Sequence, residues 1–352
     1  AQNSAPLFIT ETSNMALIDR VESPPAERTS LLQFLIARPE FGPFVLLVLE
    51  IIIFTTLSGA FLSPQNISNL LAFTPELGML ALGMTMLMTA GEFDLSVGSV
   101  FGFTPIIMWT LYNEGVTGLE VAFIISLLLA LLIGAVNGFM VTRLKIPSFL
   151  VTLGMLLVVR GTALYITDGF PQSRWTTDSP LLGFLVGEFQ IGQIRIYNSV
   201  LWFIVFTVIL GYVLMLSRAG NWIQAAGGNP SSARARGVRV DRTKILLFML
   251  TAVISAWAGI TSSIRVATAN PNSGTGYELE VIAMVVIGGT ALTGGRGTII
   301  GTVIGVLILR FMRNGIVLVG VPGLAYNIFI GAIILGMMAL HSWLERRHHA
   351  GT

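Results

Sequence analysis

Ten apolar runs, separated by short polar stretches, occupy the chain from residue 43 to residue 340. A helix of roughly 20 apolar residues crosses a hydrocarbon core about 30 Å thick, and it satisfies its own backbone hydrogen bonds there. The pattern therefore predicts an all-α integral membrane protein with about ten transmembrane helices, some of them short or broken. The runs are 43–61, 70–91, 96–112, 118–141, 148–166, 199–216, 245–264, 281–292, 298–319 and 323–340.

The second run, 70–91, is interrupted by Pro75 and Glu76. Proline supplies no backbone N–H to the helix, and a charged side chain is costly inside a bilayer. We therefore expect a kinked or discontinuous helix at this point.

Glycines recur four residues apart within two of the apolar segments. They are Gly134, Gly138, Gly297, Gly301 and Gly305. Small residues at this spacing let two helix backbones approach closely in lipid, so we expect these glycines to mark helix–helix contacts.

Composition supports the membrane assignment, because 54% of the residues are hydrophobic and only 11% are charged, against about 25% charged residues in soluble domains. The net charge of +2 gives no reason to expect nucleic acid as a partner. There is no cysteine, and all three histidines lie at or after His341. We therefore expect no enzyme activity, catalytic residue, cofactor or metal site.

Basic residues gather on one side of the membrane when ten crossings are counted from a cytosolic N-terminus. These positions are Arg143, Lys145, the segment 217–244, Arg296, Arg346 and Arg347. Cytosolic loops carry the excess of arginine and lysine, so this side is predicted to be cytosolic, with both termini there. The loops 167–198 and 268–280 are then external.

These assignments divide the chain into three parts. Residues 1–40 are polar and are predicted to form a cytosolic, largely disordered tail. Residues 41–344 form the transmembrane domain, and 345–352 form a second cytosolic tail.

Five charged residues need separate comment. Arg160, Arg310 and Arg313 fit the side assignment poorly. Glu120 and Arg265 lie near helix ends, from which their side chains can reach the interface by snorkelling.

The basic segment 217–244 contains a sequence typical of a short cytosolic helix. Asn229 before Pro230 is a helix start, with asparagine as the cap and proline in the first position. We expect a helix over 231–236 that ends at Gly237 in the left-handed conformation. Such a helix either fits a groove of a partner protein or belongs to a solvated loop. The residues expected to touch a partner are Asn229, Pro230, Ser231, Ala233, Arg234, Arg236 and Gly237.

Four acids lie in or between apolar runs, where ionisable groups usually serve a function. Glu92 and Asp94 stand in the stretch GEFDLSVGS, and Glu50 and Glu76 stand within runs. A role for Asp94 and Ser96 as caps of the next helix, starting near Leu95, is compatible with lining a solute pathway. The candidate pathway residues are Glu76, Glu92, Asp94 and Ser96, while Glu50 and Glu76 have packing between helices as the alternative.

No nucleotide-binding sequence of the form G-x-x-x-x-G-K-[ST] occurs in the chain. The two lysines are Lys145 and Lys244, and neither follows a glycine. Any ATP used for transport must therefore be hydrolysed by a different polypeptide.

Four separated motifs, in order, resemble the permease subunits of bacterial ABC importers of the ribose and xylose type, over about residues 45–340. The motifs are LALGMTMLMTAGEFDLSVGSV, AAGGNPSSARARGVRVDRTK, TANPNSGTGYELEVIAMVVIGGTALTGGRGTIIGTVIG and LRFMRNGIVLVGV. The resemblance implies a multi-pass protein of the inner membrane, paired with a second copy or a sister permease in the bilayer. Its other partners would be cytosolic ATP-binding subunits and a periplasmic sugar-binding protein, and 217–244 would be the coupling segment.

The resemblance implies inward transport of a monosaccharide or polyol. The sequence departs from the family pattern GIDLSVGS, because an additional acid, Glu92, stands near Asp94, and Glu76 occupies a position that is more often apolar. Because of these additional acids, the solute need not be ribose: another monosaccharide, a polyol or a cationic solute are alternatives. The competing function is a self-sufficient secondary transporter or channel that uses the intramembrane carboxylates.

Overall fold

The computed structural model describes residues 40–173, 179–326, 328–332 and 335–336. All of them belong to one compact unit that comprises residues 39–352. The predicted N-terminal tail, apart from Glu40, and the predicted tail 345–352 lie outside the described residues.

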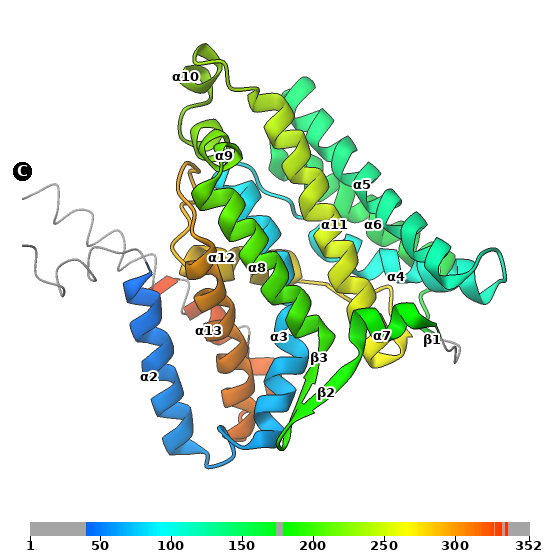
Figure 1. Ribbon diagram of the computed structural model, residues 1–352, viewed down its shortest axis with the longest axis vertical. Coiled ribbons are helices and arrows are strands. Elements are labelled where there is room, and N and C mark those ends of the chain that lie inside the picture. The colour runs from blue at the N-terminus through cyan, green and yellow to red at the C-terminus, as the bar shows by residue number, and fades with distance from the viewer. Residues whose placement is uncertain (1–39, 174–178, 327, 333–334, 337–352) are drawn as a thin grey trace, which may run out of the picture. The chain divides into compact units, whose positions relative to one another are not determined.

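The described chain is almost entirely helical (Figure 1). The helices are α2 (Phe41–Leu57), α3 (Pro64–Thr89), α4 (Val97–Asn113), α5 (Leu119–Arg143), α6 (Ser148–Ile166), α7 (Pro180–Val186), α8 (Asn198–Leu216), α9 (Arg218–Gly228), α10 (Pro230–Ala235), α11 (Val240–Val266), α12 (Tyr277–Ile287), α13 (Ile299–Leu318) and the 3₁₀ turn η1 (Gly323–Ala325). Two small antiparallel pairs accompany them, β1 (Gln172–Ser173) with β4 (Thr268–Ala269), and β2 (Glu188–Ile191) with β3 (Ile194–Tyr197).

The all-α membrane class predicted from the sequence is confirmed. Within the described ranges, six helices are long and apolar enough to cross a membrane, namely α3, α5, α6, α8, α11 and α13. Helices α2, α4 and α12 overlap predicted runs, but with 17, 17 and 11 residues they are shorter than these six helices. The last run, 323–340, is only partly described. The number of ten crossings therefore stays a prediction.

Helix α3 is the central helix of the bundle, packed against α8, α11, α12 and α13. Every residue from Thr74 to Ala90 is buried. The helix continues through Pro75, so of the two expected forms, kinked or discontinuous, the discontinuous one is wrong. Proline costs the helix one backbone hydrogen bond, and neighbouring helices packed on all sides support the segment that has lost it.

The predicted glycine contacts are confirmed on two helix pairs. A Cβ atom built on Gly134 of α5 would lie 2.5 Å from the carbonyl oxygen of Phe248 in α11, and one on Gly138 would lie 2.7 Å from Ile245 Cα. On α13, a Cβ at Gly301 or Gly305 would collide with backbone of α12 and the residue that follows it. Backbone therefore touches backbone at these positions, as small-residue packing in membranes predicts.

Replacing Gly134 with alanine should destabilise the protein by about 1–3 kcal/mol, since neither backbone can yield to the new methyl group. Gly154 in α6 provides the matched control, because nothing lies within 4 Å of the same added atom. Gly154→Ala should stabilise by up to about 1 kcal/mol through helix propensity alone. Unfolding of both variants in mixed micelles measures the difference, and equal stabilities would contradict the packing assignment.

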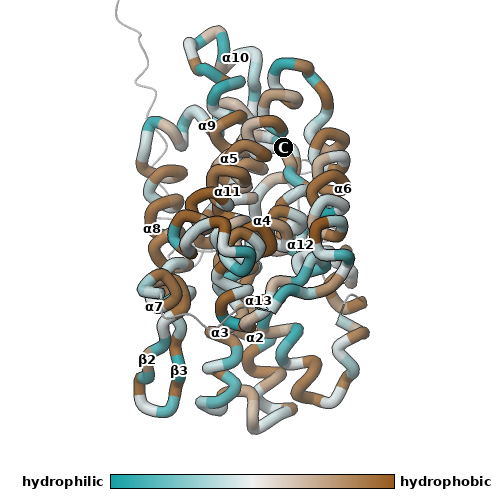
Figure 2. The backbone as a smooth tube through the Cα atoms, turned by 90° about the vertical axis from the view of Figure 1, so that its right-hand side faces the viewer, coloured by the Kyte–Doolittle hydropathy of each residue, from teal (hydrophilic) through white to brown (hydrophobic). Residues whose placement is uncertain are grey.

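Long faces of several helices remain exposed in a single copy of the chain. Large apolar side chains on α5, α6 and α8 point outward, and Figure 2 shows the hydrophobic colouring along these helices. Contiguous apolar surface of this extent is rare on soluble monomers. Lipid tails are the medium that such faces require.

The two ends of the bundle differ in charge. The upper end in Figure 1, which we call the basic end, carries α9, α10 and the cations at the end of α5 and the start of α11. The opposite end carries the β2–β3 hairpin and the loop after α11. There Arg195 and Glu188 pair at 3.5 Å, and hydrogen bonding with Tyr197, together with the Glu188 charge, raises the pKa of Arg195 above its usual value.

Candidate functional site

Helix α10 forms a short projection at the basic end, as the sequence predicted. Asn229 Oδ1 accepts a hydrogen bond from the Ser232 backbone N–H at 3.0 Å, and Pro230 occupies the first helical position. Gly237 follows the helix with φ of 84°. Both helix-end predictions are thus confirmed, and the cap and the left-handed glycine fix a helix too short to be stable by itself.

The seven predicted coupling residues occupy this projection, but not all of them face outward. Ala233 is only 3% exposed and packs with Ala226 and Val240. Arg234 donates to Asp241 Oδ1 at 2.9 Å, while Arg236 is exposed. Ala233 therefore anchors the projection, and the exposed serines and arginines form the surface available to a partner.

The end of α9 meets the end of α3 through bare backbone. We call this contact the glycine junction; it consists of Gly91, Gly227, Gly228, Gly294 and Gly295. A Cβ on Gly294 would lie 2.8 Å from Gly91 Cα and 3.1 Å from Gly227 Cα, and one on Gly295 would lie 2.8 Å from Gly228 Cα. The Gly295 N–H also donates to the Thr89 carbonyl at 2.8 Å. Helix α9 is therefore joined to the end of α3 directly, at Gly227 and Thr89, and also through the α12–α13 loop that contains Gly294 and Gly295.

Sequence reasoning missed the glycine junction. Gly294 and Gly295 have φ of 81° and 80°, a conformation that glycine adopts without strain. The sequence does contain a signal for this contact, namely the two pairs of adjacent glycines at 227–228 and 294–295.

Glu92 has no cation near it in the sequence, but in the structure it is paired with one. Lys244 at the start of α11 donates to Glu92 Oε1 at 2.5 Å, and both side chains are largely buried. The lysine neutralises the acid, so Glu92 joins the α3–α4 connection to α11.

Asp94 lies at the start of α4 in a fully buried polar cluster. Its Oδ1 accepts from the Ser96 N–H at 2.8 Å and from Ser96 Oγ at 2.5 Å. Asn137 of α5 in turn donates to Ser96 Oγ at 3.0 Å. The expected bond from Asp94 to a backbone N–H is present. However, α4 begins at Val97, and Ser96 makes no side-chain cap bond, so the expectation for Ser96 is wrong.

Glu76 forms a buried ion pair with Arg265 of α11. The Arg265 Nε and a terminal nitrogen reach Glu76 Oε1 at 2.9 and 2.8 Å, and the two side chains are 4% and 8% exposed. The guanidinium also lies 4.1 Å from the ring centre of Phe73. Arg265 does not snorkel, because pairing with a buried carboxylate and stacking on an aromatic ring satisfy it inside the bundle.

A second buried acid, Glu280 of α12, contacts Arg313 of α13 and Tyr326. The Tyr326 hydroxyl donates to Glu280 Oε1 at 2.7 Å, and Arg313 lies 3.9 Å from Glu280 Oε2. Arg160 on α6, another cation that fitted the side assignment poorly, donates to the carbonyls of Pro271 and Ser273 at 2.5 and 2.7 Å. These arginines are therefore structural links near the end opposite α10.

Glu50 of α2 is the acid whose environment differs most from the others. It is 4% exposed, on the side of α2 that packs against α13, and neither carboxylate oxygen has a hydrogen-bond partner among the described residues. The expected hydrogen bond between helices is therefore not found for Glu50.

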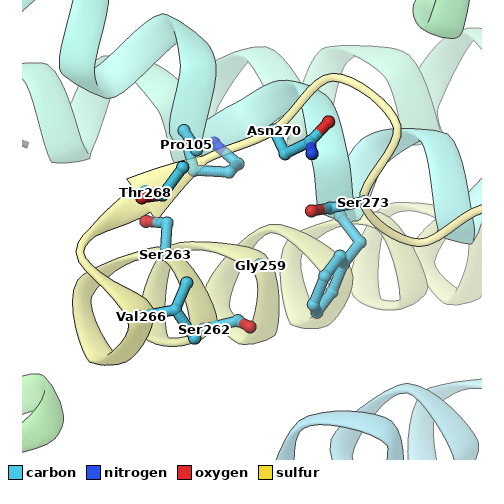
Figure 3. A pocket seen from close by; sticks show the side chains of 10 residues that line it. Pro105, Gly259, Ser262, Ser263, Val266, Thr268, Asn270 and Ser273 are labelled. Carbon is cyan, nitrogen blue, oxygen red and sulfur yellow. The ribbon is translucent and has the colours of Figure 1, made fainter. Parts of the chain in front are cut away.

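A cavity of about 20 Å³ lies between α4, the end of α11 and the loop after it. Ser263, Thr268, Asn270 and Ser273 surround it, as Figure 3 shows. Its volume suits a single water molecule and is far too small for a sugar. The cavity does not touch Glu92, Asp94 or Ser96, so the candidate pathway residues do not gather around it.

Comparison with known proteins identifies the kind of molecule. Residues 66–338 match the family described as the branched-chain amino acid transport system / permease component. The ribose import permease protein of Escherichia coli K12 is 36% identical over 84% of this chain and 91% of its own length. The xylose/arabinose import permease protein of Sulfolobus acidocaldarius is 34% identical over 88% and 87%. The ribose import permease protein of Bacillus subtilis is 36% identical over 84% and 90%. No solved structure matches significantly.

Proposed function

This chain belongs to the family of branched-chain amino acid transport system permease components, and from that premise we propose that it carries a monosaccharide or polyol into a bacterial cell across the inner membrane. It is a multi-pass membrane permease of a sugar importer and not an enzyme. The ribose and xylose/arabinose names of its relatives support the solute class. The sequence has no P-loop, so the ATPase is a separate protein.

The observation that carries the proposal is the attachment of the α9–α10 projection to α3. A partner that moves α10 moves α9 with it, because Ala233 packs on Ala226. The glycine junction then delivers the movement to the buried central helix. ATP-driven motion outside the membrane thereby acts on α3, the helix packed against α8, α11, α12 and α13.

The remaining partners follow from the two ends of the bundle. The β2–β3 hairpin and the 268–276 loop offer the surface for a periplasmic sugar-binding protein. A second copy or a sister permease would complete the solute pathway between two chains. The permease should hold the solute weakly, since conduction requires release as well as binding.

The ion pairs favour this function over a self-sufficient secondary transporter. Two of the four acids that such a transporter would use, Glu76 and Glu92, are paired with Arg265 and Lys244. A carboxylate held by a cation is poorly placed to bind and release a proton or a solute cation.

The first test is gentle solubilisation from the native membrane, followed by mass spectrometry of the proteins that copurify. A subunit with a P-loop is expected, and liposomes containing both subunits should take up the sugar only with ATP and the binding protein. A permease that purifies alone and moves solute in liposomes without ATP would contradict the proposal.

Arg236→Glu should lower ATP-dependent uptake at least about tenfold while the protein still inserts and folds. The exposed side chain of Arg236 has no hydrogen bond or ion pair with another described residue, so reversal of its charge acts on a partner. A reversed charge at a protein interface costs several kcal/mol. Arg195→Glu, exposed at the opposite end, is the control for copurification of the ATPase, which it should leave unchanged. Its uptake is not compared, because Arg195 lies on the β2–β3 hairpin proposed to meet the binding protein. Unchanged uptake in Arg236→Glu would remove α10 as the coupling surface.

A further inference from the structure

A basic pocket of about 240 Å³ opens at the basic end between the end of α5, α10 and the start of α11. Its lining contains four arginines and a single acid. The lining residues are Arg143, Arg234, Val238, Arg239, Val240, Asp241 and Arg242. The positive-inside rule accounts for arginines at this end, but it does not account for a hollow that they share.

The charges of the pocket are not balanced within the protein. Asp241 forms ion pairs with Arg234 at 2.9 Å and with Lys145 at 3.7 Å. Arg143, Arg239 and Arg242 have no side-chain hydrogen bond or ion pair to another residue of the described part. The pocket therefore keeps an excess of guanidinium groups, which bind phosphate in bidentate fashion.

The pocket lies where an apolar surface ends. Large apolar residues spaced three or four apart form an exposed stripe along α5 that leads to Arg143. They are Val121, Ile125, Leu128, Leu132, Val136 and Phe139. On α11, Leu246 is 62% exposed and stands four residues from Arg242 on the same helical face. Arg143 and Arg242 are thus one turn away from the exposed apolar side chains of Phe139 and Leu246.

We propose that this pocket binds the phosphate of an anionic phospholipid of the inner leaflet. The guanidinium groups of Arg143 and Arg242 hold the headgroup, and the acyl chains follow the exposed side chains of Phe139 and Leu246. Basic pockets between transmembrane helices on the cytosolic side suit anionic headgroups. The inference needs the membrane location of the chain, but it does not depend on the solute or on the coupling role of α10.

A carboxylate of the ATPase is the other anion that could reach these arginines. The recess favours lipid, because the pocket lies beside α10 rather than on its exposed surface and is flanked by the exposed apolar side chains of Phe139 and Leu246. Arg234 is shared with the predicted coupling surface, and for that reason it is left unchanged in the test.

The experiment compares retention of phosphatidylglycerol and phosphatidylcholine by the detergent-purified permease in native mass spectrometry. Arg143→Gln/Arg242→Gln should weaken phosphatidylglycerol retention at least about tenfold, since each arginine near the surface attracts an anionic lipid. Arg218→Gln is the matched control. This arginine is exposed at the same end, after the exposed Leu216, and does not line the pocket. It should retain the lipid like the unchanged protein.

Two further arms separate the sources of phosphate and the competing partner. Inorganic phosphate at millimolar concentration should leave the lipid bound, because the acyl chains add apolar contact; its displacement of the lipid would assign the pocket to free phosphate. Loss of the lipid on adding the ATPase would assign it to that subunit. Equal retention of the two lipids by the unchanged protein overturns the proposal even if the double variant fails to fold. So does equal loss in the Arg218 variant.

Discussion

Replacing Arg265 with methionine should destabilise the permease by about 3–5 kcal/mol, because it leaves Glu76 buried without its partner. The pair bridges α3 and α11 in a region where both side chains are at most 8% exposed. Methionine keeps much of the apolar length of arginine, so the loss measures the charge more than the packing. Unfolding in mixed micelles, followed by circular dichroism, gives the free energy of unfolding.

The double variant Glu76→Leu/Arg265→Met tests the same pair from the other side. With both charges removed, most of the stability should return, since a buried pair and an apolar replacement are often nearly equivalent. The single variant Glu76→Leu completes the comparison. If the double variant loses as much stability as the two single variants together, the two side chains do not interact. Uptake by the double variant with its ATPase then shows whether the charges also serve transport.

Gly227→Ala should abolish most ATP-dependent uptake, with a fall of at least about tenfold. The added methyl group would collide with the Thr89 carbonyl and would lie 2.6 Å from the Gly295 nitrogen. Overpacking of this kind costs about 1–3 kcal/mol, and about 1.4 kcal/mol in a barrier changes a rate tenfold. Uptake in liposomes that contain the ATPase and the binding protein measures the effect.

Gly228→Ala is the adjacent control for the glycine junction. The same methyl group there would lie 3.7 Å from Gly295 Cα, an ordinary contact, so uptake should stay within about twofold of the unchanged protein. Equal uptake by the two alanine variants would contradict the role of the junction. Equal loss in both would place the cause in helix α9 itself.

The sequence was sufficient wherever the controlling forces are local. The start of α10 follows from Asn229 and Pro230, and its end follows from Gly237, because each acts on a neighbouring backbone group. The apolar runs located the helices for a similar reason, since a spanning segment must bond within itself. The four-residue spacing of Gly134 and Gly138 was enough to predict that α5 packs closely against another helix.

The partners of the acids could not be found in this way. Lys244 is 152 residues from Glu92, and Arg265 is 189 residues from Glu76. Only the packing of α3 against α11 brings each pair together, and helical periodicity contains no information about which helices will touch. The same reason explains why a kinked or discontinuous helix was expected at Pro75 and Glu76, where the helix continues without a break.

The glycine junction also sets how faithfully a displacement passes through the molecule. Contacts between long side chains absorb small shifts by changing rotamer, and such compliance would dissipate part of a short stroke. Between Gly227 and Gly294 there are no rotamers to change, and the backbones are already at contact distance. A rigid contact of this kind is what the proposed coupling requires, because side chains cannot absorb the displacement of α9 before it reaches the end of α3.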